Sequence, residues 1–553
     1  MAEQPHGPEE DRKPQSDEAH SAFTPPAGVE PPGLPEEDQP TSEFAVPEGL
    51  ATEPPNEPEG SAFAPPSSSA AFDTRFAHPA YTPAQGTRAM RLAKDAPWQD
   101  HMRTMLRMPV HERPVAEPVL RQEEGEGPAV PRVLDLTLRI GELLLAGGEG
   151  AEDVEAAMFA ICRAYGLDRC EPTVTFTLLA VTHQPSLVDD PVTVSRTVRR
   201  RGTDYTRLTA VYQLIADINA DDSEVTLEEA YRRLALIRRN RHPYPGWALT
   251  LAAGGLAGAA SVLLGGGVAV FLIAAAGAML GDRLAWLAAG RGLPEFYQFV
   301  LAAVPPAALG VTVSLLHAGL RPSAVITGGL FALIPGRALV ASVQDGLTGF
   351  YITASARLLE VGYLFVAIVV GVLTALYMGV QLGAKLNPEG SVELVERPLT
   401  QIAAAMVLSL CFAILLQQER TTVLFAVCNG AVAWVVFAAI TFTAEGSAVM
   451  ATALAAGLVG LFGQLMARYQ HTSSLVYVTA AIGPLLPGSA MYYGVLAIAQ
   501  SRMDAGFTSL ARAAALALAI AIGVNLGGEL ARMFIRAPGS AASRRAAKRT
   551  RGF

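Results

Sequence analysis

The chain has 553 residues, of which 51% are hydrophobic and only 17% are charged, against about a quarter charged in a typical soluble protein. Its four cysteines include no CxxC pair, which argues against a disulfide scaffold and a zinc ribbon. The net charge of −9 is unevenly spread, because residues 1–60 carry 15 acidic and 2 basic side chains, a net of −13, and residues 61–553 therefore carry +4. A body so apolar and so weakly basic is not expected to bind nucleic acid.

Residues 1–130 are predicted to be a disordered acidic tail. They are rich in Pro, Glu, Ala and Ser and contain four Pro-Pro steps. Such a composition buries too little apolar surface to offset the entropy lost on ordering. Within the tail, residues 88–108 mix basic side chains with Met, Leu and Trp98. This stretch either lies on an anionic membrane surface or forms a solvated, partly helical linker.

Residues 131–242 are predicted to form a small soluble α/β domain. Apolar residues at helical spacing indicate a helix that begins near Leu134 and ends at Gly147-Gly148, and a second helix over 151–165 before Gly166. The β-branched runs at 173–182 and 192–198 predict strands. Two further helices follow, the second of them beginning at a capping box, Thr226–Glu229.

This domain contains candidate acids and bases but no recognisable catalytic set. The candidates are Glu142, Glu149, Glu152, Asp153, Glu155 and His183. No Gly-rich phosphate loop, HExxH motif, serine elbow or metal-spaced His/Cys cluster accompanies them. A helix dipole favours acidic residues at a helix start in any case, and a His after a strand is more often a turn residue. We therefore expect no enzyme, no metal and no cofactor.

From Gly246 onward the chain is almost free of charge. Residues 246–384 and 401–534 each contain nine charged residues and no lysine. A soluble protein with so many long apolar stretches would lack a polar surface, so these stretches are predicted to be membrane helices of roughly 20 residues each. Ten are expected, at residues 246–265, 268–289, 297–317, 322–343 and 352–382, then at 401–418, 421–441, 446–467, 475–499 and 506–533.

The two apolar blocks resemble one another. Residues 328–336 and 481–488 both end in Pro-Gly, and an Ala-Arg pair follows in each block, at Arg357 and at Arg512. A repeat of five spans places its two copies in opposite orientations, an arrangement that alternating-access transporters use. The predicted fold is a polytopic α-helical membrane protein of two five-helix inverted repeats, preceded by the α/β domain and the tail.

Arginine-rich flanks predict the orientation of the spans. Five arginines between 232 and 241 precede the first span, and residues 535–553 are again basic. By the positive-inside rule both termini lie in the cytoplasm, and the connector 385–400, with three Glu, lies outside. The expected location is the cytoplasmic membrane, crossed several times.

The Pro-Gly pairs are the first candidates for a substrate site. Pro335-Gly336 and Pro487-Gly488, with Pro484, interrupt the helical hydrogen bonding, which is tolerated at depth only beside a cavity or other protein. The N-terminus of a half-helix offers amides and a positive dipole to a carboxylate. Two kinks that serve only helix packing are the alternative.

Ionisable side chains inside the predicted spans are costly and therefore need a partner or a role. Asp282 and Glu360 are candidates for a coupling proton or a substrate ammonium, and Arg357 and Arg512 for a substrate carboxylate. Each could instead form an internal ion pair or reach the interface. Asn429 and Asn525 are candidates for additional hydrogen bonds.

Residues 131–534 resemble the threonine/serine exporters. The resemblance rests on the order of the parts and on short motifs: Gly141–Gly147, Val154-Glu155, Glu229-Ala230, and the Ile-Pro-Gly and Leu-Pro-Gly turns at 334–336 and 486–488. It implies a ten-helix inner-membrane exporter with a cytoplasmic N-terminal domain, driven by the proton motive force. Two-chain relatives are linked to dicarboxylate export, and a hydrolase-like role has been suggested for the family's soluble domain.

The expected function is export of threonine or serine by proton antiport. The expected partners are these amino acids, protons and the lipid bilayer, and the oligomeric state is left open, a homo-oligomer included. A dicarboxylate exporter is the alternative within transport. A membrane-tethered hydrolase or sensor is the alternative outside it, but a mere anchor needs neither a repeat nor paired breaks.

Overall fold

The computed structural model describes residues 98–106 and 130–535, apart from 187, 200–201, 203, 221–222, 240–242, 317–318, 385–397, 444–445 and 471. The predicted tail (98–106 and 130 excepted), most of the predicted connector 385–400 and almost all of the basic segment 535–553 lie outside the described residues. The described chain is mostly helical and contains one three-stranded sheet.

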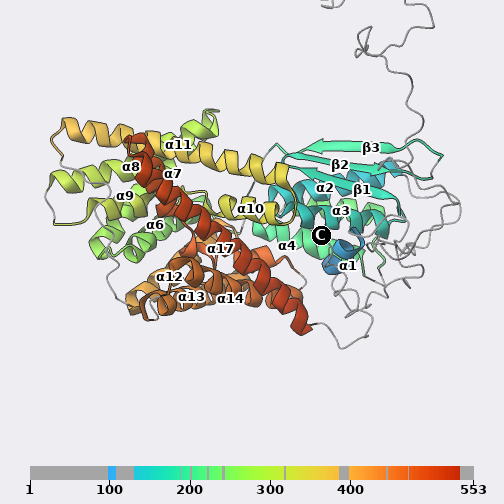
Figure 1. The fold of residues 1–553 in the computed structure, drawn as a ribbon. Coiled ribbons are helices and arrows are strands. Elements are labelled where there is room, and N and C mark those ends of the chain that lie inside the picture. Colours follow the sequence, from blue (N-terminus) through green and yellow to red (C-terminus); the bar gives the residue numbers. More distant parts are fainter. Residues whose placement is uncertain are drawn as a thin grey trace, which may run out of the picture. The chain divides into compact units, whose positions relative to one another are not determined.

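The N-terminal region, residues 130–239, combines four helices with that sheet (Figure 1). Its helices are α2 (Val130–Ala146), α3 (Ala151–Ala164), α4 (Tyr205–Ile218) and α5 (Leu227–Arg239). The strands β1 (Cys170–Thr175), β2 (Leu178–His183) and β3 (Val192–Thr197) pair antiparallel in the order β1-β2-β3. Helix α2 packs on β2 and β3, and α3 packs on β1.

The core of this region is built from the apolar faces predicted for α2 and α3. Leu134, Leu144, Val154 and Met158 are fully buried. Gly141 lets the two helices approach closely, since a Cβ there would lie 2.8 Å from the sulfur of Met158. The structure thus places both helices where the apolar periodicity predicted them.

The prediction of one strand over residues 173–182 is wrong. The run is a hairpin, in which Thr175 pairs with Leu178 and Phe176-Thr177 form the turn. Phe176 adopts a positive φ of 50°, which in most hairpins is supplied by Gly or Asn. The sequence carries no such residue, and the turn is instead held by a hydrogen bond from the Phe176 amide to the Thr353 hydroxyl, 3.0 Å away.

Neither interpretation of residues 88–108 describes α1 (Trp98–Leu106), the part of that stretch that the structure describes. Met102 and Met105 are buried against Phe159 and its neighbours on α3, and Trp98 contacts the ring of Tyr212. The apolar face of α1 therefore packs on protein. His183, predicted as a turn residue, is buried in the last position of β2, where its ring is 3.2 Å from the carbonyl of Arg169.

Helices make up the chain from Gly246 to Ile535. The first block contains α6 (Gly246–Leu263), α7 (Val268–Gly290), α8 (Glu295–Leu315), α9 (Pro322–Leu330), α10 (Gly336–Leu347) and α11 (Tyr351–Gln381). The second contains α12 (Pro398–Leu415), α13 (Arg420–Ala438) with the π-helical η3 (Ala439–Thr443), α14 (Ala448–Tyr469), α15 (Ser474–Val478), the 3-10 turn η4 (Gly483–Leu485), α16 (Gly488–Ala499) and α17 (Met503–Ile535).

Eight of these helices are long and apolar enough to cross a membrane: α6, α7, α8, α11, α12, α13 with η3, α14 and α17. The other two predicted spans, 322–343 and 475–499, are each broken into shorter pieces. Helix α9 ends at Leu330 and α10 begins after Pro335, while α15 ends at Val478 and α16 begins after Pro487. Proline lacks an amide donor and clashes with a preceding helical turn, which explains both breaks.

The two blocks share most of their helix contacts. Helix α7 packs on α6 and α8, α8 on α9 and α11, and α10 on α11; in the same way α13 packs on α12 and α14, α14 on α15 and α17, and α16 on α17. The long helix α17 lies beside α14 (Figure 1). The blocks touch through α6 with α12, α10 with α17, and α11 with α16.

Candidate functional site

The two Pro-Gly breaks pack against each other. A Cβ built on Gly336 would lie 3.2 Å from the Cβ of Leu486, and one on Gly488 would lie 2.9 Å from Cγ2 of Ile334. The residue before each Pro-Gly pair thus covers the glycine of the other pair. Pro484 lies in η4, shortly before the second break. The structure therefore brings together the five break residues that the sequence singled out.

Hydroxyl groups lie next to these breaks. The hydroxyls of Thr327 on α9 and Tyr493 on α16 are 2.9 Å apart, so they join the two broken segments. The neighbouring Tyr492 is 1% exposed, and its hydroxyl has no hydrogen-bond partner in the described part of the chain. A buried hydroxyl without a partner is costly and is a ready donor or acceptor for a ligand.

A second polar group lies where the N-terminal region meets the helices. Glu149 is in the loop between α2 and α3 and is 3% exposed. Its carboxylate accepts hydrogen bonds from the hydroxyls of Tyr212 on α4 and Ser473, the residue just before α15. Burial raises the pKa of Glu149 above its ordinary value, although these two hydrogen bonds and two nearby arginines, Arg103 and Arg337, oppose the shift.

Tyr205, the buried first residue of α4, connects the two broken segments at this junction. Its hydroxyl accepts a hydrogen bond from Nη1 of Arg337, 3.3 Å away, and donates one to Oγ1 of Thr479, 3.1 Å away. Arg337 follows the first break directly, and Thr479 is the residue just after α15. Gly148, with φ of +91°, leaves room for the guanidinium of Arg337 against the loop.

A buried ion pair forms the other side of the junction. Nη1 of Arg357 lies 2.6 Å from Oδ2 of Asp345, and the two side chains are only 6% and 1% exposed. Arg357 also donates from Nη2 to the carbonyl of Glu149 at 3.2 Å, while Asp345 accepts from the amide of Ala151 at 3.2 Å. The dipole of α3 also favours the negative charge of Asp345, which lies at the N-terminus of that helix. Arg357 thus forms the internal ion pair that was the alternative to a substrate contact.

Together these contacts define what we call the polar junction: Glu149, Tyr205, Tyr212, Arg337, Asp345, Arg357, Ser473 and Thr479. Through it the N-terminal region touches both ends of α10, at Arg337 and Asp345, and both ends of α15, at Ser473 and Thr479. Of its members the sequence singled out Arg357 as a site residue and offered Glu149 only among unsupported acids. Glu149 could have been noticed as a carboxylate enclosed by glycines, in Gly147–Gly150.

The remaining predicted residues lie outside the two breaks and the polar junction. Asp282 on α7 is half-buried and accepts a hydrogen bond from Thr250 on α6, 2.6 Å away, and Glu360 on α11 is half-buried. Asn429 on α13 is 8% exposed and donates to the carbonyl of Val459 on α14 at 3.2 Å. Asn525 is half-buried on α17. Arg512, on the same helix, is exposed, unlike Arg357 in the matching motif.

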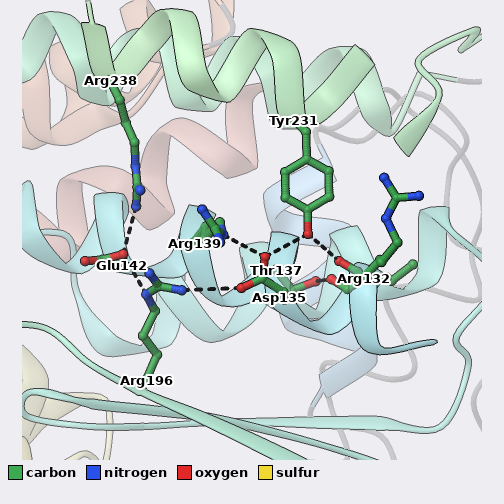
Figure 2. Close-up of polar contacts among 9 residues, drawn as sticks. Arg132, Asp135, Thr137, Arg139, Glu142, Arg196, Tyr231 and Arg238 are labelled. Carbon is green, nitrogen blue, oxygen red and sulfur yellow. Dashed lines mark hydrogen bonds and ion pairs between the residues drawn. The ribbon is translucent and has the colours of Figure 1, made fainter. Parts of the chain in front are cut away.

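A surface network attaches α5, which leads into α6, to α2 (Figure 2). Glu142 on α2 binds both Arg238 of α5 and Arg196 of β3 at 2.8 Å. Asp135, two turns earlier, accepts from the hydroxyl of Tyr231 at 2.8 Å and from Arg139 at 2.6 Å. Burial opposes the ionisation of Asp135, but the hydrogen bonds from Tyr231 and Arg139 outweigh it, so its pKa is lowered.

Within the described residues no group of three or more His, Cys, Asp and Glu side chains is arranged to hold a metal ion. The Sγ of Cys170 lies 3.5 Å from the ring of His183, and Cys162 is buried nearby, 3.5 Å from the hydroxyl of Thr137. These contacts belong to the core of the N-terminal region.

Eight apolar helices of spanning length, with two broken segments packed between them, define a polytopic helical membrane protein. Residues 135–379 match a family model of threonine/serine exporters, and residues 401–528 match a second model, described as "Threonine/Serine exporter, ThrE". The chain belongs to the threonine/serine exporter family.

Two curated relatives cover most of the chain. A "Probable threonine/serine exporter" of Mycobacterium tuberculosis is 34% identical over 408 residues, 72% of this chain and 76% of the relative. A "Threonine/serine exporter" of Corynebacterium glutamicum is 32% identical over 434 residues, 74% of this chain and 84% of the relative. No solved structure matches the chain significantly.

Proposed function

We propose that this chain exports small amino acids, threonine or serine first, across the cytoplasmic membrane by proton antiport. Family membership and the names of both relatives support the substrate class. The observation that carries the mechanism is the direct packing of Ile334-Pro335-Gly336 against Leu486-Pro487-Gly488. Two broken segments in contact are a suitable place for a substrate that is passed from one side of a membrane to the other.

The proposal includes ten crossings in two inverted repeats of five. The duplicated helix contacts support it, because most contacts between helices of the first block have a counterpart in the second. The start of α11 and the turns before α13 and α15 all contact the N-terminal region, through Arg357, Leu416 and Ser473. The N-terminal region also leads directly into α6, and the start of α6 lies on the same side as these contacts only if α9 with α10 forms one crossing. Arginines in α5, next to the first span, place that side in the cytoplasm.

The proposed substrate path runs along the two breaks. Helices α10 and α16 both begin at the glycine of a break, so their first amides and dipoles can bind a carboxylate there. The unpartnered hydroxyl of Tyr492, together with Tyr493 and Thr327, can bind the side-chain hydroxyl of threonine or serine. Asn429 and Asn525 remain candidates for additional hydrogen bonds, and Arg512 for a carboxylate, on weaker support.

Asp282 and Glu360 are the proposed proton carriers within the spans. Asp282 is half-buried between α6 and α7, where the hydroxyl of Thr250 donates to its carboxylate, and Glu360 is half-buried on α11. Acidic side chains within transmembrane helices mark the proton paths of pumps and transporters, which suits a coupling role.

The test is counterflow in proteoliposomes of the purified full chain, with labelled threonine, serine and succinate in parallel and an imposed pH gradient. We expect exchange of threonine or serine that is lost in a Pro487→Ala/Gly488→Ala double variant. A Gly362→Ala variant is the control, because a Cβ at Gly362 on α11 meets nothing within 4 Å.

Exchange of succinate alone would replace the amino-acid proposal with dicarboxylate export. No flux of any of the three substrates from folded protein would refute transport of these compounds. In that case residues 131–242 would be assayed for an enzymatic or sensory activity, the alternative outside transport.

A further inference from the structure

The loop that carries Glu149 lies between the two broken segments on the side of the N-terminal region. Glu149 binds Ser473 before α15 through its side chain and Arg357 of α11 through its carbonyl. The next amide, Ala151 N, binds Asp345 at the end of α10. One short loop is therefore bonded to both blocks of helices at the ends of the segments that the proposed path follows.

We propose that this loop is the cytoplasmic gate of the exporter and that Glu149 is a proton-binding group, which loses its proton to the cytoplasm when the gate opens. The inference rests on the proposed function, and it adds a residue of the N-terminal region to the transport cycle. In the structure the gate is closed, because each of the loop's three polar contacts with the helices is made and Glu149 is buried.

Opening the gate changes the environment of Glu149 in a way that couples it to the proton. Substrate entering from the cytoplasm must part the loop from α10 and α15, since the loop bridges them. Water then reaches Glu149, whose neutral form was favoured by burial, and its carboxyl group ionises. When the gate closes behind the substrate, Tyr212, Ser473 and the nearby arginines Arg103 and Arg337 hold the ionised carboxylate, which takes its next proton only when the path opens to the opposite side. Proton release inward and substrate entry from the same side are what antiport by an exporter requires.

The groups around Glu149 come from every element packed against it. Arg103 of α1 and Arg337 of α10 contribute positive charge, and Tyr212 of α4 and Ser473 contribute hydroxyl donors. Arg103 is itself paired with Asp153 of α3, Arg337 binds Tyr205, and Arg357 is paired with Asp345. Because these cations have other partners, the closed gate does not depend on an ionised Glu149.

The main test uses Glu149→Gln in the full chain, since the amide still accepts hydrogen bonds from Tyr212 and Ser473 but cannot release a proton. We expect threonine exchange at equal pH to stay close to that of the wild type, while threonine flux driven by a pH gradient falls by about tenfold or more. Glu155→Gln is the matched control. Glu155 is a half-buried acid of α3 whose carboxylate accepts a hydrogen bond from the amide of Val174 on β1, and it is not a member of the polar junction.

A second measurement follows the gate itself. Gly150→Cys is placed in a background where the exposed Cys428 is replaced by Ser, and the rate of labelling by a charged maleimide is measured with and without threonine. Gly150 has an ordinary φ of −66°, so a cysteine fits there, and it is half-buried. We expect threonine to accelerate the labelling, and alanine substituted at Gly362 to leave the effect unchanged.

Three results would overturn the inference. The first is coupled flux in Glu149→Gln equal to that of the wild type, and the second is loss of both exchange and coupled flux in that variant. The third is a labelling rate at position 150 that does not change when threonine is added. The second would assign Glu149 a purely structural role. Absence of threonine and serine flux in the wild-type chain is a separate outcome, because it refutes the proposed function and the gate with it.

Discussion

Replacing Arg357 with alanine tests whether the junction holds the N-terminal region to the helices. The substitution leaves Asp345 buried, at 1% exposure, with no cation beside it, and it also removes the hydrogen bond to the carbonyl of Glu149. Breaking a buried pair by removing one partner costs about 3–5 kcal/mol. At about 1.4 kcal/mol per factor of ten, the ratio of folded to unfolded protein falls by roughly two to three and a half powers of ten.

The matched control is Arg512→Ala, which changes the corresponding Ala-Arg motif on α17 at an exposed position and should cost no more than about 0.5 kcal/mol. The free energy of unfolding is measured by titrating the purified full chain in mixed micelles with SDS and following its circular dichroism. The double variant Asp345→Asn/Arg357→Gln should lose less than the sum of its single variants, by at least about 1 kcal/mol. Equal losses for Arg357→Ala and Arg512→Ala, or strict additivity in the double variant, would refute the reasoning.

Three further predictions concern packing and pH. Gly488→Val should lower the free energy of unfolding by about 1–3 kcal/mol and abolish exchange, because the valine side chain must displace Ile334 where the two breaks pack together. Gly362→Val, whose side chain faces open space, should transport normally. Both variants are compared by flux assays and unfolding titrations. Burial raises the pKa of Glu155 from 4.5 to about 7, so folding favours the neutral form of this carboxyl group. The free energy of unfolding therefore falls as the pH rises from about 4.5 to 7, by about 3 kcal/mol in full. Glu155→Gln should be more stable than the wild type at pH 8 and lose this advantage at pH 4. The effect of pH on stability through Asp135 has the opposite sign, because its pKa is lowered in the folded protein. Its ionised form adds stability at neutral pH, and this stability is lost in acid, below the ordinary range of a carboxyl group. Asp135→Asn should flatten that part of the pH profile of thermal unfolding.

The break residues can be predicted from the sequence because proline and glycine act on their own backbone. Pro335 and Pro487 interrupt a helix wherever they occur in a long apolar stretch, and their matched positions in the two blocks mark them as a pair. Arg357 is predictable for a similar reason, since a charge inside an apolar helix needs a partner. Its partner, Asp345, lies two residues past the predicted end of the fourth span, so nothing in the sequence links the two.

The rest of the junction is out of reach of sequence patterns because its members are distant in the chain. Glu149 and Ser473 are 324 residues apart, and Tyr205 and Thr479 are 274 apart. Each is an ordinary residue in its local context, a loop acid, a helix cap or a core tyrosine. Periodicity reports which face of a helix is buried, but it does not report which distant element covers that face.

What the sequence determined by itself was what depends on local chemistry: where the apolar helices run, where two of them break, and that a segment of helices and strands precedes them. The hairpin turn at Phe176 and the position of α1 were decided by tertiary contacts, with Thr353 and with α3, which outweighed weak local preferences. The same holds for the site. Proline breaks a helix unaided, whereas a buried carboxylate such as Glu149 acquires its partners and its raised pKa only when the folded chain excludes water from it.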